Sequence, residues 1–216
     1  MSTPRASTGA AFFDALETRD PEAREAAQLA ALSAQIAHAK ARTTAASARL
    51  RDVDAAAINS RAALATLPVL RKHELLEAQT AHRDGDPFGG FAAIGWGRHR
   101  DRATRASRVF ASPGPIHEPE SDRPDYWRMG RALFAAGIRA GDLVHNTFSY
   151  HFTPAGAMMD SGARAIGCTV FPAGTGQTDL QVQTMKTMKR YRRMPTSARP
   201  ASCACSSKRP TSSASR

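Results

Sequence analysis

The sequence predicts an α/β fold: a helical N-terminal lead followed by part of a parallel sheet. Two observations carry this prediction, namely helical apolar spacing in the first fifty residues and a strand–helix–strand pattern between residues 142 and 172. A strand, a helix and a strand joined by a crossover of about twenty residues form a βαβ unit, which implies parallel strands and a right-handed crossover.

The N-terminal lead begins with residues 10–48, which are expected to be helical. Asp20-Pro21-Glu22 combines a capping side chain, a proline at the first helical position and an acid in the first turn. Apolar residues then recur every three or four positions and form one stripe, at Leu29, Leu32, Ile36 and Ala39. Asn59 or Ser60 is expected to cap a further short helix that stops before Pro68.

The second part of the chain alternates strands and helices. A strand over residues 108–111 is expected to run into the turn Ser112-Pro113-Gly114-Pro115, and an amphipathic helix is expected over residues 126–136. The βαβ unit is then predicted as a strand at 142–146, a helix at 154–165 and a strand at 168–171.

Two loops follow the carboxyl ends of these last strands, where parallel sheets bind ligands. Residues 146–153 include several aromatic side chains and would line an aromatic pocket. Residues 173–178 are rich in glycine and would let the backbone approach a phosphate or a nucleotide. The alternative is that both segments are connectors whose aromatic residues belong to the core.

Charge is divided unevenly along the chain. The formal net charge is +11, but residues 1–185 hold 21 basic and 19 acidic residues, whereas residues 186–216 hold nine basic residues and no acid. The basic character therefore belongs mostly to the tail, and neither a nucleic-acid nor a membrane partner is expected for the folded part. No apolar run approaches the length of a membrane span and the N-terminus is polar, so a cytoplasmic location is expected.

Three cysteines do not make a disulfide framework. Cys168 lies in an apolar run and is expected to be a buried thiol. Cys203 and Cys205 have a spacing that does not suit zinc, so no metal site is predicted.

Four segments resemble the bacterial phenylacetate–CoA ligases, a branch of the adenylate-forming enzymes. The most specific runs from Gly162 through Gly167 and Pro172 into Gly176-Gln177-Thr178. The others are residues 67–75, residues 88–92 and residues 135–142. The similarity covers roughly residues 10–185, which corresponds to the start of the large N-terminal domain in that family.

The resemblance implies a reaction in which an aryl acid and ATP, with Mg²⁺, form an acyl-adenylate that passes its acyl group to coenzyme A. By position, Tyr150 and Phe152 would line the aryl-acid pocket, although Thr147 competes with Tyr150 for the place of a pocket tyrosine. Gly176, Gln177 and Thr178 would lie near the nucleotide, so that ATP, coenzyme A and a small aryl acid are the expected partners.

The chain departs from the family at the phosphate loop, which is replaced here by residues 111–119. Two prolines remove N–H donors, the expected lysine is absent, and Glu118 adds a negative charge. Ser112, Gly114 and His117 are the residues from which a variant ATP-binding loop would be built. No catalytic residue is assigned, because the family's C-terminal machinery has no counterpart in these residues.

The tail has a composition typical of disorder, but it becomes structured when it is read in another frame. Shifting the codons of residues 194–214 gives a short apolar segment, a Gly-Thr-Pro-Ser turn and a leucine-rich amphipathic helix, as the family has next. The chain is therefore interpreted as a helical lead and connector loop (1–105), a partial α/β nucleotide- and acyl-binding domain (106–185), and an out-of-frame tail (186–216). The expected function is a truncated, inactive aryl-acid–CoA ligase; the alternative is a non-enzymatic basic interaction fragment.

Overall fold

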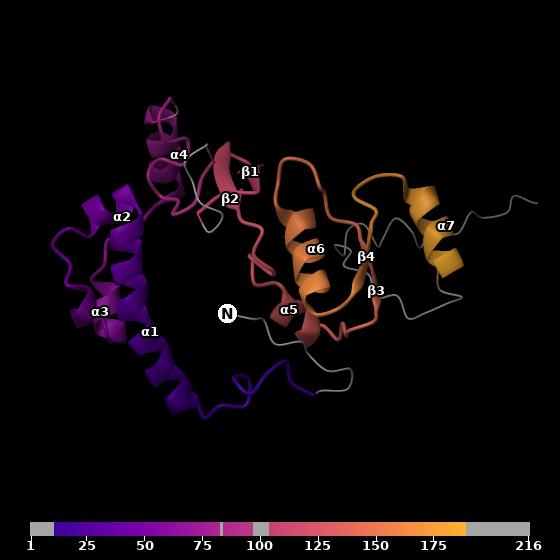
Figure 1. Ribbon diagram of the computed structural model, residues 1–216, viewed down its shortest axis with the longest axis horizontal. Coiled ribbons are helices and arrows are strands. Elements are labelled where there is room, and N and C mark those ends of the chain that lie inside the picture. Colours follow the sequence, from indigo (N-terminus) through magenta and orange to yellow (C-terminus); the bar gives the residue numbers. More distant parts are fainter. Residues whose placement is uncertain (1–10, 83, 97–103, 189–216) are drawn as a thin grey trace, which may run out of the picture. The chain divides into compact units, whose positions relative to one another are not determined.

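The computed structural model describes residues 11–82, 84–96 and 104–188 (Figure 1). The predictions for residues 189–216 lie outside the described residues. The chain forms two compact units. We call residues 15–122 the lead unit, and residues 123–188 together with residues 11–14 the sheet unit.

The lead unit begins with helix α1 (Pro21–Arg42), whose start agrees with the sequence prediction. The Asp20 carboxylate accepts hydrogen bonds from the backbone N–H groups of Glu22 (2.9 Å) and Ala23 (3.0 Å), and Pro21 occupies the first turn. The helical prediction was wrong for residues 11–19, which form turns and bends. A residue before proline is held out of the helical region, and Asp20 has ψ 139°, so the helix does not extend backward through it.

Four short helices complete the helical part of the lead unit. They are α2 (Thr44–Arg49), η1 (Ala55–Ala57), α3 (Arg61–Ala65) and α4 (Lys72–Ala81). Thr43 is extended and separates α1 from α2. Of the two predicted caps, Ser60 is the one used, since its hydroxyl oxygen accepts the N–H of Ala63 at 3.1 Å.

A β-hairpin follows in the lead unit, with β1 (Arg108–Ser112) antiparallel to β2 (Ile116–Glu120). The predicted strand and turn are confirmed, while β2 was not predicted. Arg108 closes the open end by pairing with the buried carboxylate of Glu120 at 2.8 Å. Gln79 of α4 pairs with the backbone of His117: its Nε2 donates to the carbonyl oxygen at 3.0 Å and its Oε1 accepts the N–H at 2.8 Å. The buried amide of Gln79 thus ties the hairpin to α4.

The sheet unit contains the predicted βαβ arrangement. β3 (Leu143–Asn146) and β4 (Thr169–Pro172) are parallel, with Leu143 opposite Thr169 and Asn146 opposite Pro172. Helix α6 (Ala155–Ala165) connects the two strands and packs on both. Helix α7 (Thr178–Met188) follows β4 and was not predicted. The βαβ prediction and the α/β class are therefore confirmed.

The helix predicted over residues 126–136 is shorter than expected, because only α5 (Gly130–Ala135) is helical. Asp125 accepts the N–H groups of Met129 (2.7 Å) and Gly130 (3.0 Å). Asp125 and Arg128 both have positive φ, at 48° and 59°. The carboxylate of Asp125 therefore stabilises a turn over residues 126–129 and starts the helix four residues later than the amphipathic pattern suggested.

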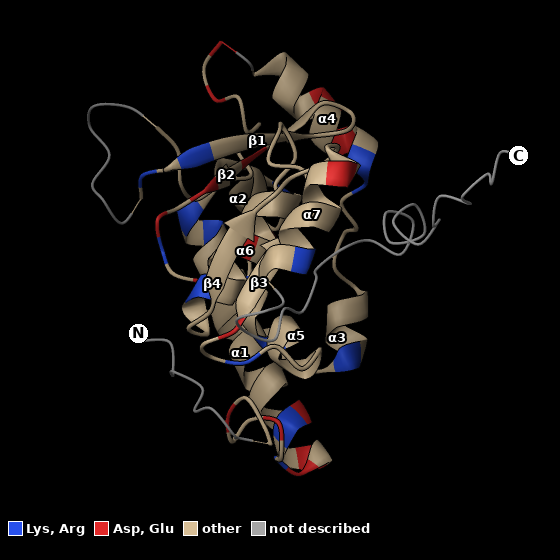
Figure 2. Ribbon diagram, turned by 90° about the vertical axis from the view of Figure 1, so that its right-hand side faces the viewer, with Lys and Arg blue, Asp and Glu red and all other residues tan. Residues whose placement is uncertain are grey.

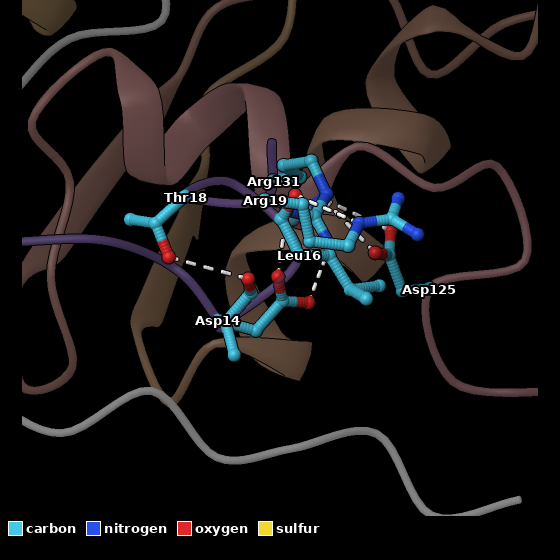
Figure 3. Close-up of polar contacts among 8 residues, drawn as sticks. Asp14, Leu16, Thr18, Arg19, Asp125 and Arg131 are labelled. Carbon is cyan, nitrogen blue, oxygen red and sulfur yellow. Dashed lines mark hydrogen bonds and ion pairs between the residues drawn. The ribbon is translucent and has the colours of Figure 1, made fainter. Parts of the chain in front are cut away.

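Apolar residues of α5, α6 and β3, and of the segments that follow the two helices, form the core of the sheet unit. They are Leu133, Ile138, Val144, Ala163, Ile166 and Cys168. The N-terminal segment joins this unit: the ring of Phe13 packs edge-on against Phe134 with centroids 5.6 Å apart. Arg131 lies over the Phe13 ring at 4.8 Å and donates to both carboxylate oxygens of Asp14 (Figure 3).

Basic and acidic residues are interleaved along the described elements, and α7 carries both Asp179 and Lys186 (Figure 2). Among the helices of the described ranges, none combines the length and the apolar character needed to cross a bilayer.

Candidate functional site

The candidate site lies where β3 and β4 end. We call residues 147–154 the β3–α6 loop and residues 173–177 the β4–α7 loop. Because the strands are parallel, both loops leave the same edge of the strand pair. The N–H of Gly174 donates to the carbonyl oxygen of Asn146 at 3.0 Å. The structure thus brings together the two loops that the sequence analysis proposed.

Asn146, the last residue of β3, stabilises the β3–α6 loop through hydrogen bonds of its buried side chain. Its side chain is fully buried, and its Nδ2 donates to the Tyr150 hydroxyl oxygen (2.7 Å) and to the Gly156 carbonyl oxygen (2.9 Å). Its Oδ1 accepts the N–H of Phe148 at 3.2 Å. Sequence analysis missed this role, although an amide at the end of a buried strand and directly before a loop is a signal that could have indicated it.

Gln181 of α7 supports the β4–α7 loop. Its Nε2 donates to the carbonyl oxygens of Gly174 (3.1 Å) and Gly176 (2.5 Å). Gly174 and Gly176 have positive φ, and an added Cβ would meet nothing within 4 Å at either position. Glycine is therefore favoured here by backbone conformation, and the loop is sterically open to an approaching ligand.

His145 of β3 lies opposite Phe171 of β4, one residue before Asn146. Its side chain is fully buried and stacks on Phe171, with ring centroids 5.2 Å apart and planes 8° from parallel. Burial lowers the pKa of His145, and a side-chain contact with Gln181 opposes part of this effect. Burial therefore favours the neutral form of the imidazole.

This depressed pKa makes the stability of the protein depend on pH. The unfolded state takes up a proton near the ordinary histidine pKa of 6.5, whereas the folded state resists protonation until a lower pH. We expect the contribution of His145 to be complete above pH 6.5 and to be lost as the pH falls toward the folded-state pKa. Urea unfolding at pH 7.5, 6.5 and 5.5 (roughly one pKa unit to either side of the unfolded value) measures it.

His145→Gln should flatten this pH dependence, while His38→Gln, at an exposed histidine of α1, should leave it unchanged. If the free energy of unfolding changed equally with pH in the wild-type protein and in His145→Gln, the pH dependence could not be assigned to His145.

The two predicted aryl-pocket residues differ in their surroundings. Tyr150 is half-buried and held by Asn146, whereas Phe152 is 83% exposed and has a positive φ of 39°. Positive φ is unusual for a bulky residue and is found at functional sites more often than elsewhere. The roles of Tyr150 and Phe152 in an acyl pocket stay predictions.

The predicted nucleotide residues are divided between the two units. Gly176, Gln177 and Thr178 are exposed at the end of the β4–α7 loop in the sheet unit. Ser112 and Gly114 lie at the turn of the β1–β2 hairpin in the lead unit.

The hairpin turn is occupied by contacts within the protein. The Ser112 hydroxyl donates to the Glu118 carboxylate at 2.6 Å, and Lys72 Nζ donates to the Pro113 carbonyl oxygen at 2.9 Å. A serine whose hydroxyl donates to a carboxylate is a poor partner for a phosphate, because the carboxylate and the phosphate would repel each other. Within the described residues, no group of three acidic, histidine or cysteine side chains could hold a metal ion.

Comparison with solved structures identifies the fold. A crystal structure of 2-hydroxyisobutyryl-CoA ligase in complex with 2-HIB-AMP matches 85% of this chain and 39% of its own, with a TM-score of 0.73 and 22% identity. The same enzyme in complex with 2-HIB-AMP and CoA in the thioesterification state matches with a TM-score of 0.67 over 80% of this chain and 37% of its own. The fold is that of part of an adenylate-forming CoA ligase.

Sequence comparison then shows which enzymes the chain is related to. The phenylacetate–coenzyme A ligase of Aromatoleum evansii is 33% identical over 139 residues, which cover 61% of this chain and 28% of that enzyme. The phenylacetate–coenzyme A ligase of Pseudomonas putida is 32% identical over 130 residues, 57% of this chain and 26% of that enzyme. The resemblance to the phenylacetate–CoA ligases is thus confirmed, and the chain spans about a quarter of the length of these relatives. No family model matches the chain.

Proposed function

We propose that this chain is part of an aryl-acid–CoA ligase, in which an aryl acid and ATP form an acyl-adenylate and the acyl group then passes to coenzyme A. The observation that carries the proposal is the parallel β3–α6–β4 unit with its two joined loops, within a chain related to the phenylacetate–coenzyme A ligases. In this proposal Tyr150 and Phe152 contact the aryl group, and Gly176, Gln177 and Thr178 lie near the nucleotide.

The β4–α7 loop fits a phosphate better than the hairpin turn does. Its glycines leave the backbone open, and consecutive residues with positive φ at Gly176 and Gln177 can turn N–H groups toward an anion. The hairpin turn offers Ser112 and Gly114, but Glu118 already binds the serine hydroxyl. Mg²⁺ would enter bound to the phosphates of ATP, as is usual for this ion.

We further propose the division of the chain into residues 1–105, 106–185 and 186–216, with the last segment translated out of frame. Two observations support the out-of-frame segment. Residues 186–216 hold basic residues and no acid, unlike residues 1–185, and shifting the codons of residues 194–214 gives a leucine-rich helix. On this proposal the chain binds ligands and does not complete the reaction. Resequencing the locus tests it directly, since an unbroken reading frame through these codons, with this amino-acid sequence, would contradict it.

The function is tested with the purified 216-residue chain by two measurements. Calorimetric titration with phenylacetate, with and without ATP, is expected to give saturable binding, and ATP–pyrophosphate exchange is expected to stay at background. Turnover above background would contradict the proposed inactivity. Absence of binding of both phenylacetate and ATP would contradict the assignment to an aryl-acid–CoA ligase.

A second candidate function, a basic interaction fragment, is favoured only by the nine basic and no acidic residues of segment 186–216. A fragment that binds polyanions through these charges would bind DNA with an affinity that falls steeply with salt. We expect no salt-dependent DNA binding in an electrophoretic mobility assay, and its presence would favour this candidate over the ligase.

A further inference from the structure

The buried amide of Asn146 forms hydrogen bonds with three separate parts of the β3–α6 segment. Its partners are the hydroxyl of Tyr150, the carbonyl of Gly156 and the N–H of Phe148. Both Nδ2 hydrogens and one lone pair of Oδ1 are thereby used. An amide with these partners and no exposed surface has one orientation only, because flipping it would place acceptor against acceptor.

Tyr150 is held at both ends of its side chain by this arrangement. Its hydroxyl oxygen accepts the hydrogen bond from Asn146 at 2.7 Å. At the other end, the ring lies directly over Gly156: a Cβ added there would come within 3.0 Å of Tyr150 Cγ and within 2.5 Å of the Ser149 carbonyl oxygen. Gly156 therefore provides the space for the ring, and Asn146 fixes its far end.

The backbone of Asn146 also holds the second loop. Its carbonyl oxygen accepts the N–H of Gly174, whose own carbonyl oxygen accepts a hydrogen bond from Gln181. One residue thus links the loop proposed for the acid with the loop proposed for the nucleotide. A side-chain substitution keeps the backbone hydrogen bond, so the effect of the amide can be measured separately.

We propose that Asn146 is a positioning residue of the acyl site, which sets the position of the Tyr150 ring against which the aryl group of the acid packs. Asn146 does not touch the acid and acts on it through Tyr150. This inference rests on the proposed function, because it takes an aryl acid as the ligand. It adds a residue that no sequence motif indicated.

The test is a double-mutant cycle of Asn146→Ala and Tyr150→Phe in the 216-residue chain, with phenylacetate as the calorimetric probe. Tyr150→Phe removes only the hydroxyl and should weaken binding about fivefold, while Asn146→Ala, which loses all three side-chain bonds, should weaken it roughly tenfold. The double variant should be no weaker than Asn146→Ala, because Asn146→Ala has already removed the hydrogen bond through which the hydroxyl holds the ring in place. Asn59→Ala, at the exposed asparagine of the lead unit, is the matched control and should bind like the wild-type protein.

Effects that multiply in the double variant would overturn the proposal, since Asn146 would then act independently of Tyr150. Unchanged binding by Tyr150→Phe would also overturn it. A purely structural role would move the unfolding midpoint of Asn146→Ala without this coupling in affinity.

A second measurement separates failure of this inference from failure of the proposed function. Amide hydrogen exchange of Phe148 should be at least several times faster in Tyr150→Phe than in the wild-type protein, because the amide of Asn146 loses one of its anchors. If the wild-type chain binds neither phenylacetate nor ATP, the proposed function fails, yet hydrogen exchange at Phe148 still tests whether Asn146 and Tyr150 position the loop. Unchanged exchange at Phe148 would show that Asn146 and Tyr150 are not coupled.

Discussion

Phe134→Ala is expected to lower the free energy of unfolding by about 3–5 kcal/mol, the range measured for removal of a large buried aromatic side chain. Phe134 is only 2% exposed, so the substitution leaves a cavity inside the sheet unit. Two further contacts are lost with the ring. The edge of Phe13 packs on it, and the Arg139 guanidinium lies 3.6 Å from its centroid.

The matched control is Phe12→Ala, which removes the same group from a side chain that is 54% exposed. We expect this control to change stability by less than about 1 kcal/mol, because little apolar surface returns to water. Urea unfolding followed by circular dichroism measures both variants. Equal losses for Phe134→Ala and Phe12→Ala would contradict the packing of the N-terminal segment and α5 described above.

Gly162→Val is expected to destabilise the protein by about 3 kcal/mol, at the upper end of the cost of overpacking. Gly162 lies in α6 where this helix crosses the start of α5. A Cβ at this position would stand 2.7 Å from Met129 Cβ and 3.0 Å from the Gly130 nitrogen. The backbone of residues 129 and 130 is held by Asp125 and cannot retreat without breaking those hydrogen bonds.

Gly85→Val is the matched control for this substitution. Gly85 is exposed, and an added Cβ would meet only the His82 carbonyl oxygen at 3.9 Å. We expect its unfolding midpoint in urea to stay close to that of the wild-type protein. A Gly162→Val variant as stable as Gly85→Val would show that α5 and α6 are not in close contact at this point.

Both substitutions concern the framework that carries the candidate site. α5 packs against α6, α6 packs against β3, and β3 ends at Asn146, so loosening this packing should also weaken the hydrogen bonds of the two loops. Ligand affinity should therefore be compared only among variants whose unfolding midpoints lie well above the temperature of measurement.

Part of the candidate site was predictable because parallel strands place their carboxyl-end loops together. The strand–helix–strand order placed the loops at residues 146–153 and 173–178 after the carboxyl ends of two parallel strands, and the structure joins them through Asn146 and Gly174. The side chains whose hydrogen bonds hold the two loops could not be predicted. The pairing of Asn146 with Tyr150 and Gly156, and of Gln181 with Gly174 and Gly176, depends on how the loops fold back, which no spacing rule contains.

The β1–β2 hairpin was also predictable only in part. The strand and its Pro- and Gly-rich turn were read from composition, and the missing lysine and the repulsive Glu118 were already visible. Only the structure shows that Glu118 takes the hydroxyl of Ser112, and that Gln79, far away in the sequence, pairs with the backbone of His117. The prediction of a helix over residues 126–136 was partly wrong for a related reason. The Asp125 carboxylate accepts the N–H of Met129 and stabilises a turn where the amphipathic pattern predicted helix.

The sequence by itself determined the start of α1 at Asp20 and Pro21 and the parallel βαβ unit, and it carried the segments that resemble the phenylacetate–CoA ligases. The helix start and the βαβ unit depend on capping groups, backbone restrictions and apolar periodicity, which act between residues within one or two turns of each other. The tertiary structure alone decided that Phe13 and Asp14 belong to the sheet unit and that Asn146 holds Tyr150 in place. Such contacts form only after the chain has closed on itself, because a buried side chain takes its partners from whatever the fold brings within hydrogen-bonding distance.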